Sequence, residues 1–274
     1  EVLKNPEKLK LGGDMKELTV LFSDIRGFTT ISEGLGPEEV HRLINEYLTA
    51  MTDIVFKHGG TLDKYMGDAI MAIYGAPVDQ PDHAQKACDT ALEMMQALSG
   101  LNAGWAKEGR PVLDIGIGIN TGMMMVGNMG SEQRFEYTVL GDAVNLGSRL
   151  EGANKSYKTH ILISEFTYDK VKNEFLCMEI DSVRVKGKTR PAKIYQLMGT
   201  KEASASQAET IRYFHQGLQF YKEQKWDKAL EAFKTVSAKD KGIYAAQLYM
   251  ERIAALKSSP PPPEWDGICT MKEK

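Results

Sequence analysis

The stretch Phe22-Ser23-Asp24-Ile25-Arg26-Gly27-Phe28-Thr29 follows a short apolar run that begins at Leu18. Such a run is typical of a buried strand, so Asp24 stands where the strand ends. A lone buried carboxylate is costly, which favours a chemical role for Asp24, although a turn or capping role remains an alternative. Gly27 lacks a side chain, so the backbone amides of the following turn can approach phosphate oxygens closely.

A helix and a hairpin are predicted next along the chain. Gly36-Pro37-Glu38-Glu39 indicates a helix start, with proline at the first helical position and acidic residues near the positive end of the dipole. Apolar residues then recur every three or four positions up to His58-Gly59-Gly60, which ends the helix. Two strand-like runs, 61–65 and 69–74, flank Gly67-Asp68 and predict a hairpin.

Asp24 and Asp68 are therefore candidate metal ligands. Turn chemistry alone is an alternative explanation for Asp68, because it lies at the hairpin tip. If the hairpin pairs beside the first strand, however, the two carboxylates come together, and they repel unless they share a proton or bind cations. Oxygen ligands suit Mg²⁺ or Mn²⁺. Two such ions about 4 Å apart commonly serve in-line displacement at phosphorus.

A third motif, 136–150, places Asn145 and Arg149 four residues apart, hence on one face of a predicted helix. An amide one turn from a guanidinium could contact a ribose and a phosphate, although an exposed polar helix face is an equal alternative. A fourth motif, Val185-Lys186-Gly187-Lys188, is weak by itself, since most such lysines are simply solvated.

The remaining pattern predicts an α+β fold. The order βαββαβ, extended by an extra helix and terminal strands, corresponds to a ferredoxin-like core with helices packed on an antiparallel sheet. The further expected elements are helices over 82–101 and 143–153 and strands over 112–119, 123–126, 161–163, 175–185 and 194–197, with a turn at 120–122.

The domain organisation is predicted from composition shifts. We expect a linker over 1–14, a first domain over 15–200, a linker over 201–208, a helical segment over 209–258 and a Pro-rich tail over 259–274. Tyr213, Gly217, Phe220, Ala229 and Phe233 have spacings that resemble one tetratricopeptide repeat, a helical hairpin, with a third helix over 243–256. One repeat cannot bury its own apolar face, so it should pack on the first domain or on a partner. The prolines 260–263 predict a stiff spacer that ends compact structure.

Composition excludes several classes of protein. The 274 residues include 34 Lys and Arg against 37 Asp and Glu, a net charge of −3, which is unlike a dedicated nucleic-acid binder. Three cysteines without CxxC spacing support neither a disulfide framework nor a zinc site, which favours a reducing cytosol. The longest uncharged stretch, 115–131, is too short and polar to span a bilayer. The chain opens at Glu1 without a methionine, which leaves room for membrane segments upstream.

Taken together, the four motifs resemble the class III nucleotidyl cyclase catalytic domain, the family of adenylate and guanylate cyclases, over about residues 15–200. The resemblance implies two Mg²⁺ or Mn²⁺ ions per active site, held by Asp24, Asp68 and the backbone of Ile25. It implies that Asn145 and Arg149 act on the transition state. It further implies a substrate site formed by Lys64 and Thr138 at the purine, Lys186 at the triphosphate, and the turn residues Gly27, Phe28 and Thr29.

The resemblance also implies a homodimer in which each site takes its aspartates from one chain and the remaining residues from the other. Many adenylate cyclases carry Asp at the position of Thr138, and the threonine version resembles a subgroup described as bicarbonate-responsive. The C-terminal tail resembles that of bacterial receptor cyclases. We therefore expect the cytoplasmic catalytic region of a bacterial inner-membrane receptor, attached to the membrane only through segments upstream, with no nucleic-acid partner.

The predicted function is an adenylate cyclase that converts ATP into 3′,5′-cyclic AMP and pyrophosphate in signal transduction. Lys64 can only donate hydrogen bonds and Thr138 can accept them, a pair that matches N1 and the 6-amino group of adenine. A guanylate cyclase is one alternative. A nucleotide-binding regulatory dimer with a decayed cyclase site is another alternative. All seven motif positions hold residues compatible with activity, which argues against it.

Overall fold

The computed structural model describes residues 12–131, 133–184, 191–202, 207–262 and 265–270. The chain divides into two compact units, Glu1–Gly152 and Ala153–Lys274. Among the described residues, no helix is both long enough and apolar enough to cross a membrane.

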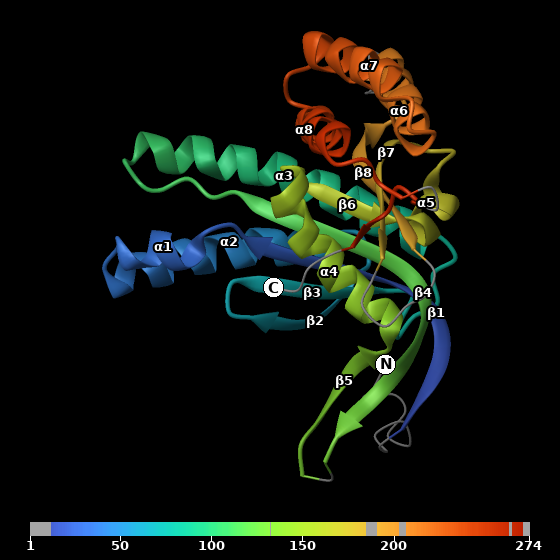
Figure 1. Ribbon diagram of the computed structural model, residues 1–274. Coiled ribbons are helices and arrows are strands. Elements are labelled where there is room, and N and C mark those ends of the chain that lie inside the picture. Colours follow the sequence, from blue (N-terminus) through green and yellow to red (C-terminus); the bar gives the residue numbers. More distant parts are fainter. Residues whose placement is uncertain (1–11, 132, 185–190, 203–206, 263–264, 271–274) are drawn as a thin grey trace. The chain divides into compact units, whose positions relative to one another are not determined.

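The first unit is built on an antiparallel sheet (Figure 1). Strand β1 (Gly12–Ile25) lies between β3 (Ala69–Tyr74) and β4 (Ile115–Gly130). Strand β2 (Thr61–Met66) pairs with β3 and completes the predicted hairpin, and β5 (Phe135–Leu140) pairs with the far end of β4. The register places Asp24 opposite Gly116, at the end of β1 that leads into the predicted phosphate-binding turn.

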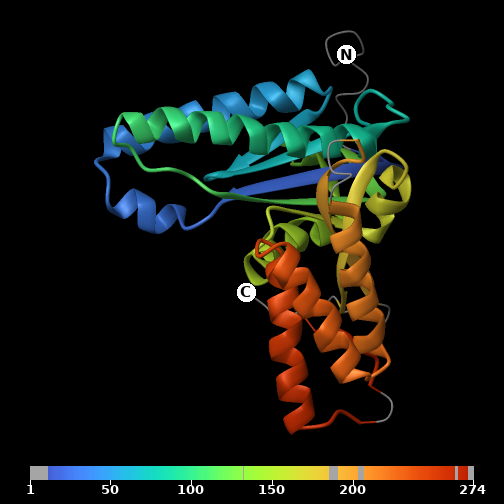
Figure 2. The same cartoon turned by 90° about the horizontal axis from the view of Figure 1, so that it is seen from above.

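Four helices belong wholly or partly to the first unit. They are α1 (Phe28–Glu33), α2 (Pro37–Lys57), α3 (His83–Lys107) and the start of α4 (Asp142–Tyr157). Proline is at the start of α2, as the sequence predicted, and the carboxylate of Glu39 accepts a hydrogen bond from the amide of Gly36. Helices α2 and α3 lie side by side in Figure 2.

The two faces of β1 follow from the alternation of its side chains. On one face, the Oγ1 of Thr19 lies 2.7 Å from the Nδ1 of His83, which begins α3, and the Oγ of Ser23 lies 3.2 Å from the hydroxyl of Tyr47 in α2. On the other face, Val20 and Phe22 are buried in a cluster that Ala143 and Val144 of α4 help to cover. The sheet is therefore a middle layer between helices, as expected of an α+β fold.

The second unit contains a short mixed sheet and the C-terminal helices. Its strands are ordered β6, β8, β7, β9, and only the pair β7–β9 is parallel. Its elements are β6 (Ile161–Ser164), α5 (Glu165–Val171), β7 (Phe175–Arg184), β8 (Ala192–Thr200), α6 (Ala208–Lys222), α7 (Trp226–Lys239), α8 (Tyr244–Ser258) and β9 (Cys269–Thr270).

The C-terminal helices pack on strand β7. The hydroxyl of Tyr249 donates to the carbonyl oxygen of Ile180 at 3.1 Å, and Arg252 pairs with the buried Asp181 at 2.6 Å. Within the helices, Phe214 and Phe233 are fully buried and their rings meet edge to face at 5.4 Å. The helical segment therefore docks on strands that the sequence assigned to the first domain. Its likeness to a tetratricopeptide repeat stays a prediction.

Three local expectations were wrong. The predicted turn at 120–122 does not exist, because Asn120 and Thr121 are buried inside one continuous strand, β4, and bond to Ala143 and Thr19. Strand β1 begins at Gly12, within the segment predicted to be a linker. Compact structure also continues past the prolines, since the ring of Trp265 lies 5.1 Å from that of Tyr221 and β9 pairs with β7.

Candidate active site

Asp24 and Asp68 meet beside the end of β1. Asp68 follows Gly67, whose φ of 69° forms the tight turn between β2 and β3. Burial raises the pKa of the Asp68 carboxyl, and the negative charge of Asp24 raises it further, whereas a hydrogen bond from the backbone of Ile25 opposes the shift. The predicted carboxylate pair is therefore present within one chain, and its charges interact.

Tyr47 lies beneath this pair. Its side chain is fully buried in α2, and burial raises the pKa of its phenol well above the usual 10, with smaller contributions from the charges of Asp24 and Asp68. Its hydroxyl lies 3.2 Å from the Oγ of Ser23, the residue that precedes Asp24. The sequence did not reveal this contact, because Tyr47 occupies one of many apolar positions on a helical face.

The carboxylate pair fits a divalent cation. Two half-buried carboxylates of like charge are stabilised by a cation, and Mg²⁺ is usually held by one or two carboxylates together with substrate phosphates and water. Among the described residues there is no cluster of three or more acidic, histidine or cysteine side chains that could hold a metal alone. The two aspartates thus suit an ion shared with a phosphate-bearing substrate, and a ligand role for the backbone of Ile25 stays a prediction.

A turn follows β1 at Gly27. Gly27 has a φ of 66°, in the left-handed region that favours glycine, and a Cβ built there would meet nothing within 4 Å. Phe28 and Thr29 begin α1 immediately afterwards. The three residues are therefore adjacent to Asp24, and their contact with phosphate oxygens stays a prediction.

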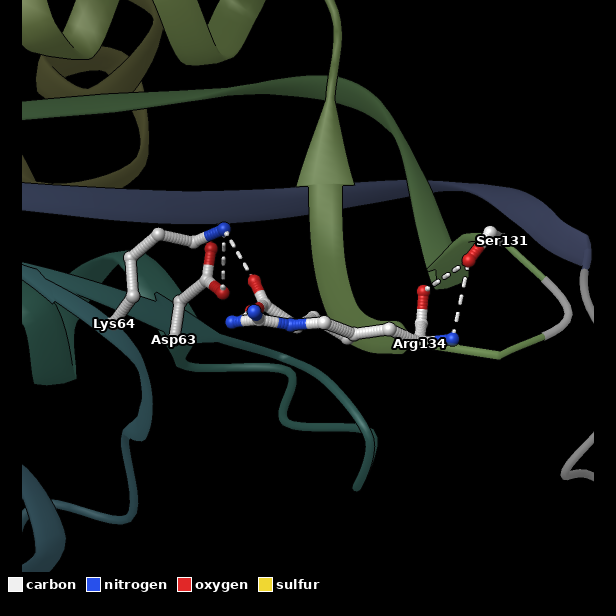
Figure 3. A network of polar contacts seen from close by, with 5 residues as sticks. Asp63, Lys64, Ser131 and Arg134 are labelled. Atoms are coloured by element: carbon white, nitrogen blue, oxygen red, sulfur yellow. Dashed lines mark hydrogen bonds and ion pairs between the residues drawn. The ribbon is translucent and has the colours of Figure 1, made fainter.

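Lys64 and Thr138 belong to a second polar group, formed between β2 and β5. The ammonium of Lys64 lies 3.2 Å from a carboxylate oxygen of Glu136 and 3.7 Å from Asp63, and the hydroxyl of Thr138 donates to Asp63 at 2.6 Å. Figure 3 shows Asp63 and Lys64 side by side, with Arg134 and Ser131 beyond them. The structure thus brings the two predicted purine-selecting residues together.

A β-bulge creates this arrangement. Leu62 pairs with Ala72 and Lys64 with Met71, so Asp63 is an extra residue in β2 without a partner in the register. Consecutive strand residues normally point to opposite faces, but a bulge redirects a side chain. Asp63 and Lys64 consequently both reach β5, where Glu136 and Thr138 share one face because they are two residues apart.

Asn145 and Arg149 lie one turn apart on α4, and both are exposed. Helix α4 approaches the sheet very closely, because Gly118 of β4 and Gly147 of α4 both lack a side chain at the contact. A Cβ on Gly118 of β4 would lie 2.4 Å from the carbonyl oxygen of Gly147 and 2.2 Å from the amide nitrogen of Glu151. The glycines therefore fix the distance between the sheet and the helix that carries both predicted catalytic residues.

The remaining predicted site residue, Lys186, lies outside the described residues. Sequence analysis also missed Asp63, Glu136 and Gly118. The patterns Asp63-Lys64 and Glu136-x-Thr138 were visible in the sequence, but nothing in it indicated the bulge that brings them together.

The site combines two interacting aspartates, one at the end of β1 and one in the β2–β3 turn, with an exposed amide–guanidinium pair on a neighbouring helix. This combination on an antiparallel sheet between helices suits a class of protein that acts on nucleotides. Residues 13–199 match the family described as the adenylate and guanylate cyclase catalytic domain. The chain belongs to this family.

Two curated relatives are adenylate cyclases. Adenylate cyclase 1 of Rhizobium meliloti is 37% identical over 188 residues, which cover 69% of this chain and 28% of the relative. The adenylate cyclase of Anabaena cylindrica is 38% identical over 199 residues, which cover 70% of this chain and 39% of the relative. The chain therefore spans well under half the length of these relatives.

Two solved structures are similar at comparable levels. The adenylyl cyclase CyaB of P. aeruginosa has 41% identity and a TM-score of 0.64, with 69% of this chain and 96% of that chain covered. The guanylyl cyclase Cya2 has 42% identity and a TM-score of 0.63, and the match covers 69% of this chain and 95% of that chain. An adenylyl cyclase and a guanylyl cyclase are equally similar to this chain, so overall similarity does not decide between ATP and GTP as the substrate. That choice depends on the residues that would contact the purine.

Proposed function

We propose that this chain is an adenylate cyclase that converts ATP into 3′,5′-cyclic AMP and pyrophosphate in signal transduction. The observation that carries the choice of ATP is that Lys64 of β2 and Thr138 of β5 both lie against Asp63, which brings a cationic donor close to a hydroxyl that can accept. Adenine presents an acceptor at N1 and donors at its 6-amino group, whereas guanine presents the reverse. The similarity to adenylate and guanylyl cyclases supports the cyclase reaction, and the choice of purine rests on these residues.

The proposed reaction joins the ribose 3′-oxygen to the α-phosphorus and releases pyrophosphate by in-line displacement. Arg149 stabilises the charge that develops on the α-phosphate, and Asn145 orients the ribose. Lys186 binds the β- and γ-phosphates as a point charge, with the amides of Gly27, Phe28 and Thr29 as further donors. Asp24, Asp68 and the Ile25 carbonyl would hold Mg²⁺ or Mn²⁺, two ions per site, which would neutralise charge and acidify the 3′-hydroxyl.

We further propose that the active site is completed by a second copy of the chain. Within one chain the residues form separate groups, the aspartates at the end of β1 and the purine-selecting pair between β2 and β5. In a twofold dimer, the aspartates of one copy face the purine pair, Asn145 and Arg149 of the other, which gives two equivalent sites.

The test is cyclic nucleotide formation from ATP with Mn²⁺, measured for the unmodified chain and for Asp24→Asn and Asp68→Asn. Each variant should lose about 10³-fold or more in kcat, because a ligand of a preorganised charge clamp is removed, and should keep its circular dichroism spectrum. Near-normal rates in both variants would contradict the metal assignment. Nucleotide binding without any product from the unmodified chain would favour the alternative of a regulatory dimer.

A further inference from the structure

The hydroxyl of Thr138 is the ambiguous half of the purine-selecting pair. A threonine hydroxyl carries one hydrogen to donate and two lone pairs to accept. It could therefore accept from the 6-amino group of adenine or donate to O6 of guanine, and by itself it selects neither base. Whether the residue discriminates depends on where its hydrogen points.

Asp63 takes that hydrogen. The Thr138 hydroxyl donates to Oδ2 of Asp63 at 2.6 Å, a short bond of the charge-assisted kind. Burial raises the pKa of the Asp63 carboxyl, whereas the hydrogen bond from Thr138 and the Lys64 ammonium, 3.7 Å from Oδ1, act in the opposite direction and stabilise the ionised form. In that form the carboxylate can only accept hydrogen bonds. The Asp63 side chain is fully buried and Thr138 is only 8% exposed, so water is a poor competitor for the bond.

The bulge in β2 places Asp63 where it can do this. A regular strand would direct Asp63 away from the face that Lys64 occupies. The extra residue in the register allows both side chains to reach β5, with Lys64 near Glu136 and Asp63 bonded to Thr138. Bulges next to active sites commonly re-aim one side chain in this way.

We infer that Asp63 is a specificity-determining residue, which fixes Thr138 as a hydrogen-bond acceptor and so rejects guanine. This inference rests on the proposed function, because it assumes that Thr138 faces the purine. With its hydrogen held by Asp63, the Thr138 oxygen presents only lone pairs to the base. Those lone pairs match the 6-amino group of adenine and repel O6 of guanine.

The experiment measures kcat/KM for ATP and for GTP, in the full chain with Mn²⁺, for Asp63→Leu, Asp63→Asn, Thr138→Val and the double variant Asp63→Leu/Thr138→Val. Asp63→Leu frees the hydroxyl to rotate and donate to O6, so the ATP-to-GTP ratio should fall about tenfold, the scale of one exchanged hydrogen bond. Asp63→Asn, which keeps the shape, should also lower the ratio. Its amide oxygen is drawn to Lys64, which leaves the NH₂ group to donate to Thr138.

The double variant shows whether the effect passes through the hydroxyl. In the Thr138→Val background, replacing Asp63 should not change the ratio further. The matched control is Tyr65→Phe on the same strand, which removes a 2.7 Å bond to Thr52 and should affect both substrates equally. The inference would be overturned if the ATP-to-GTP ratio of kcat/KM were unchanged in both Asp63 variants. It would also be overturned if Asp63→Leu lowered that ratio as much in the Thr138→Val background as in the unmodified chain.

The outcome separates this inference from the proposed function. If the unmodified chain strongly prefers ATP to GTP and the Asp63 variants keep that preference, the inferred role of Asp63 is refuted and the adenylate cyclase assignment stands. If the unmodified chain prefers GTP, the proposed function itself fails. Thermal unfolding of each variant identifies any that does not fold, and the isosteric Asp63→Asn then carries the test.

Discussion

Replacing Gly118 by alanine should separate catalysis from substrate recognition. The new Cβ would lie 2.2 Å from the amide nitrogen of Glu151 and 2.4 Å from the carbonyl oxygen of Gly147, whereas ordinary contacts begin near 3.4 Å. Both obstructing atoms are backbone, so no side chain can rotate away. Helix α4 must therefore shift from β4 by roughly 1 Å, the difference between these distances.

A shift of this size should reach Asn145 and Arg149, which α4 carries. A misplacement of about 1 Å can cost about 100-fold in rate, and overpacking should cost about 1–3 kcal/mol of stability. The assay is steady-state formation of cyclic AMP, together with thermal unfolding. We expect a loss of about 100-fold in kcat, while the ATP-to-GTP preference set at Lys64 and Thr138 stays unchanged.

The matched control is Gly100→Ala in α3, where a Cβ would meet nothing within 4 Å. That change should leave kcat unaltered and stabilise the helix by about 0.5–1 kcal/mol. A folded Gly118→Ala protein with normal kcat would refute the reasoning that α4 positions the catalytic residues.

Three further expectations concern the carboxylates, the C-terminal helices and the dimer. Asp24→Asn removes a like charge, so the pKa of Asp68, which is raised in the intact protein, should fall in a carboxyl NMR titration; an unchanged pKa would contradict their proximity. Because the pKa of Asp68 is raised, protons compete with metal from a higher pH than at an ordinary aspartate, and Mn²⁺ affinity should weaken as the pH falls. Arg252→Met leaves the carboxylate of Asp181, whose side chain is 2% exposed, without its cation and should cost about 3–5 kcal/mol in the free energy of unfolding. Lys257→Met, at an exposed ion pair with Asp227, is the control and should cost less than about 1 kcal/mol. Equal losses in the two variants would refute a structural role for the buried pair. Mixing inactive Asp24→Asn and Arg149→Ala proteins should restore one working site per heterodimer, and failure to complement after confirmed exchange of chains would contradict shared sites.

Local patterns in the sequence predicted the features that depend on near neighbours. The hairpin at Gly67-Asp68, the proline-initiated helix α2 and the strand that ends at Asp24 follow from turn chemistry, capping and apolar periodicity. Once the hairpin was placed beside the first strand, the meeting of Asp24 and Asp68 followed as well. The α+β fold was therefore predictable.

Features that depend on distant partners were not predictable in this way. Asn120 and Thr121 have the composition of a turn, yet they lie inside β4 because Ala143 and Thr19, far away in the sequence, satisfy their polar groups. Strand alternation places Asp63 and Lys64 on opposite faces, and only the bulge brings both to β5. The tail beyond the prolines is ordered by Tyr221 and Trp226, whose rings meet Trp265.

The most direct test of the proposed function is a competition assay with equimolar ATP and GTP. The full chain is incubated with both nucleotides and Mn²⁺, and the cyclic products are separated by chromatography and quantified. Lys64 donates to the base, and Thr138, whose hydrogen is held by Asp63, accepts from it. Cyclic AMP should therefore be the main product, and the yield of cyclic GMP should be a small fraction of the yield of cyclic AMP. Equal yields of the two cyclic nucleotides, or an excess of cyclic GMP, would contradict the account.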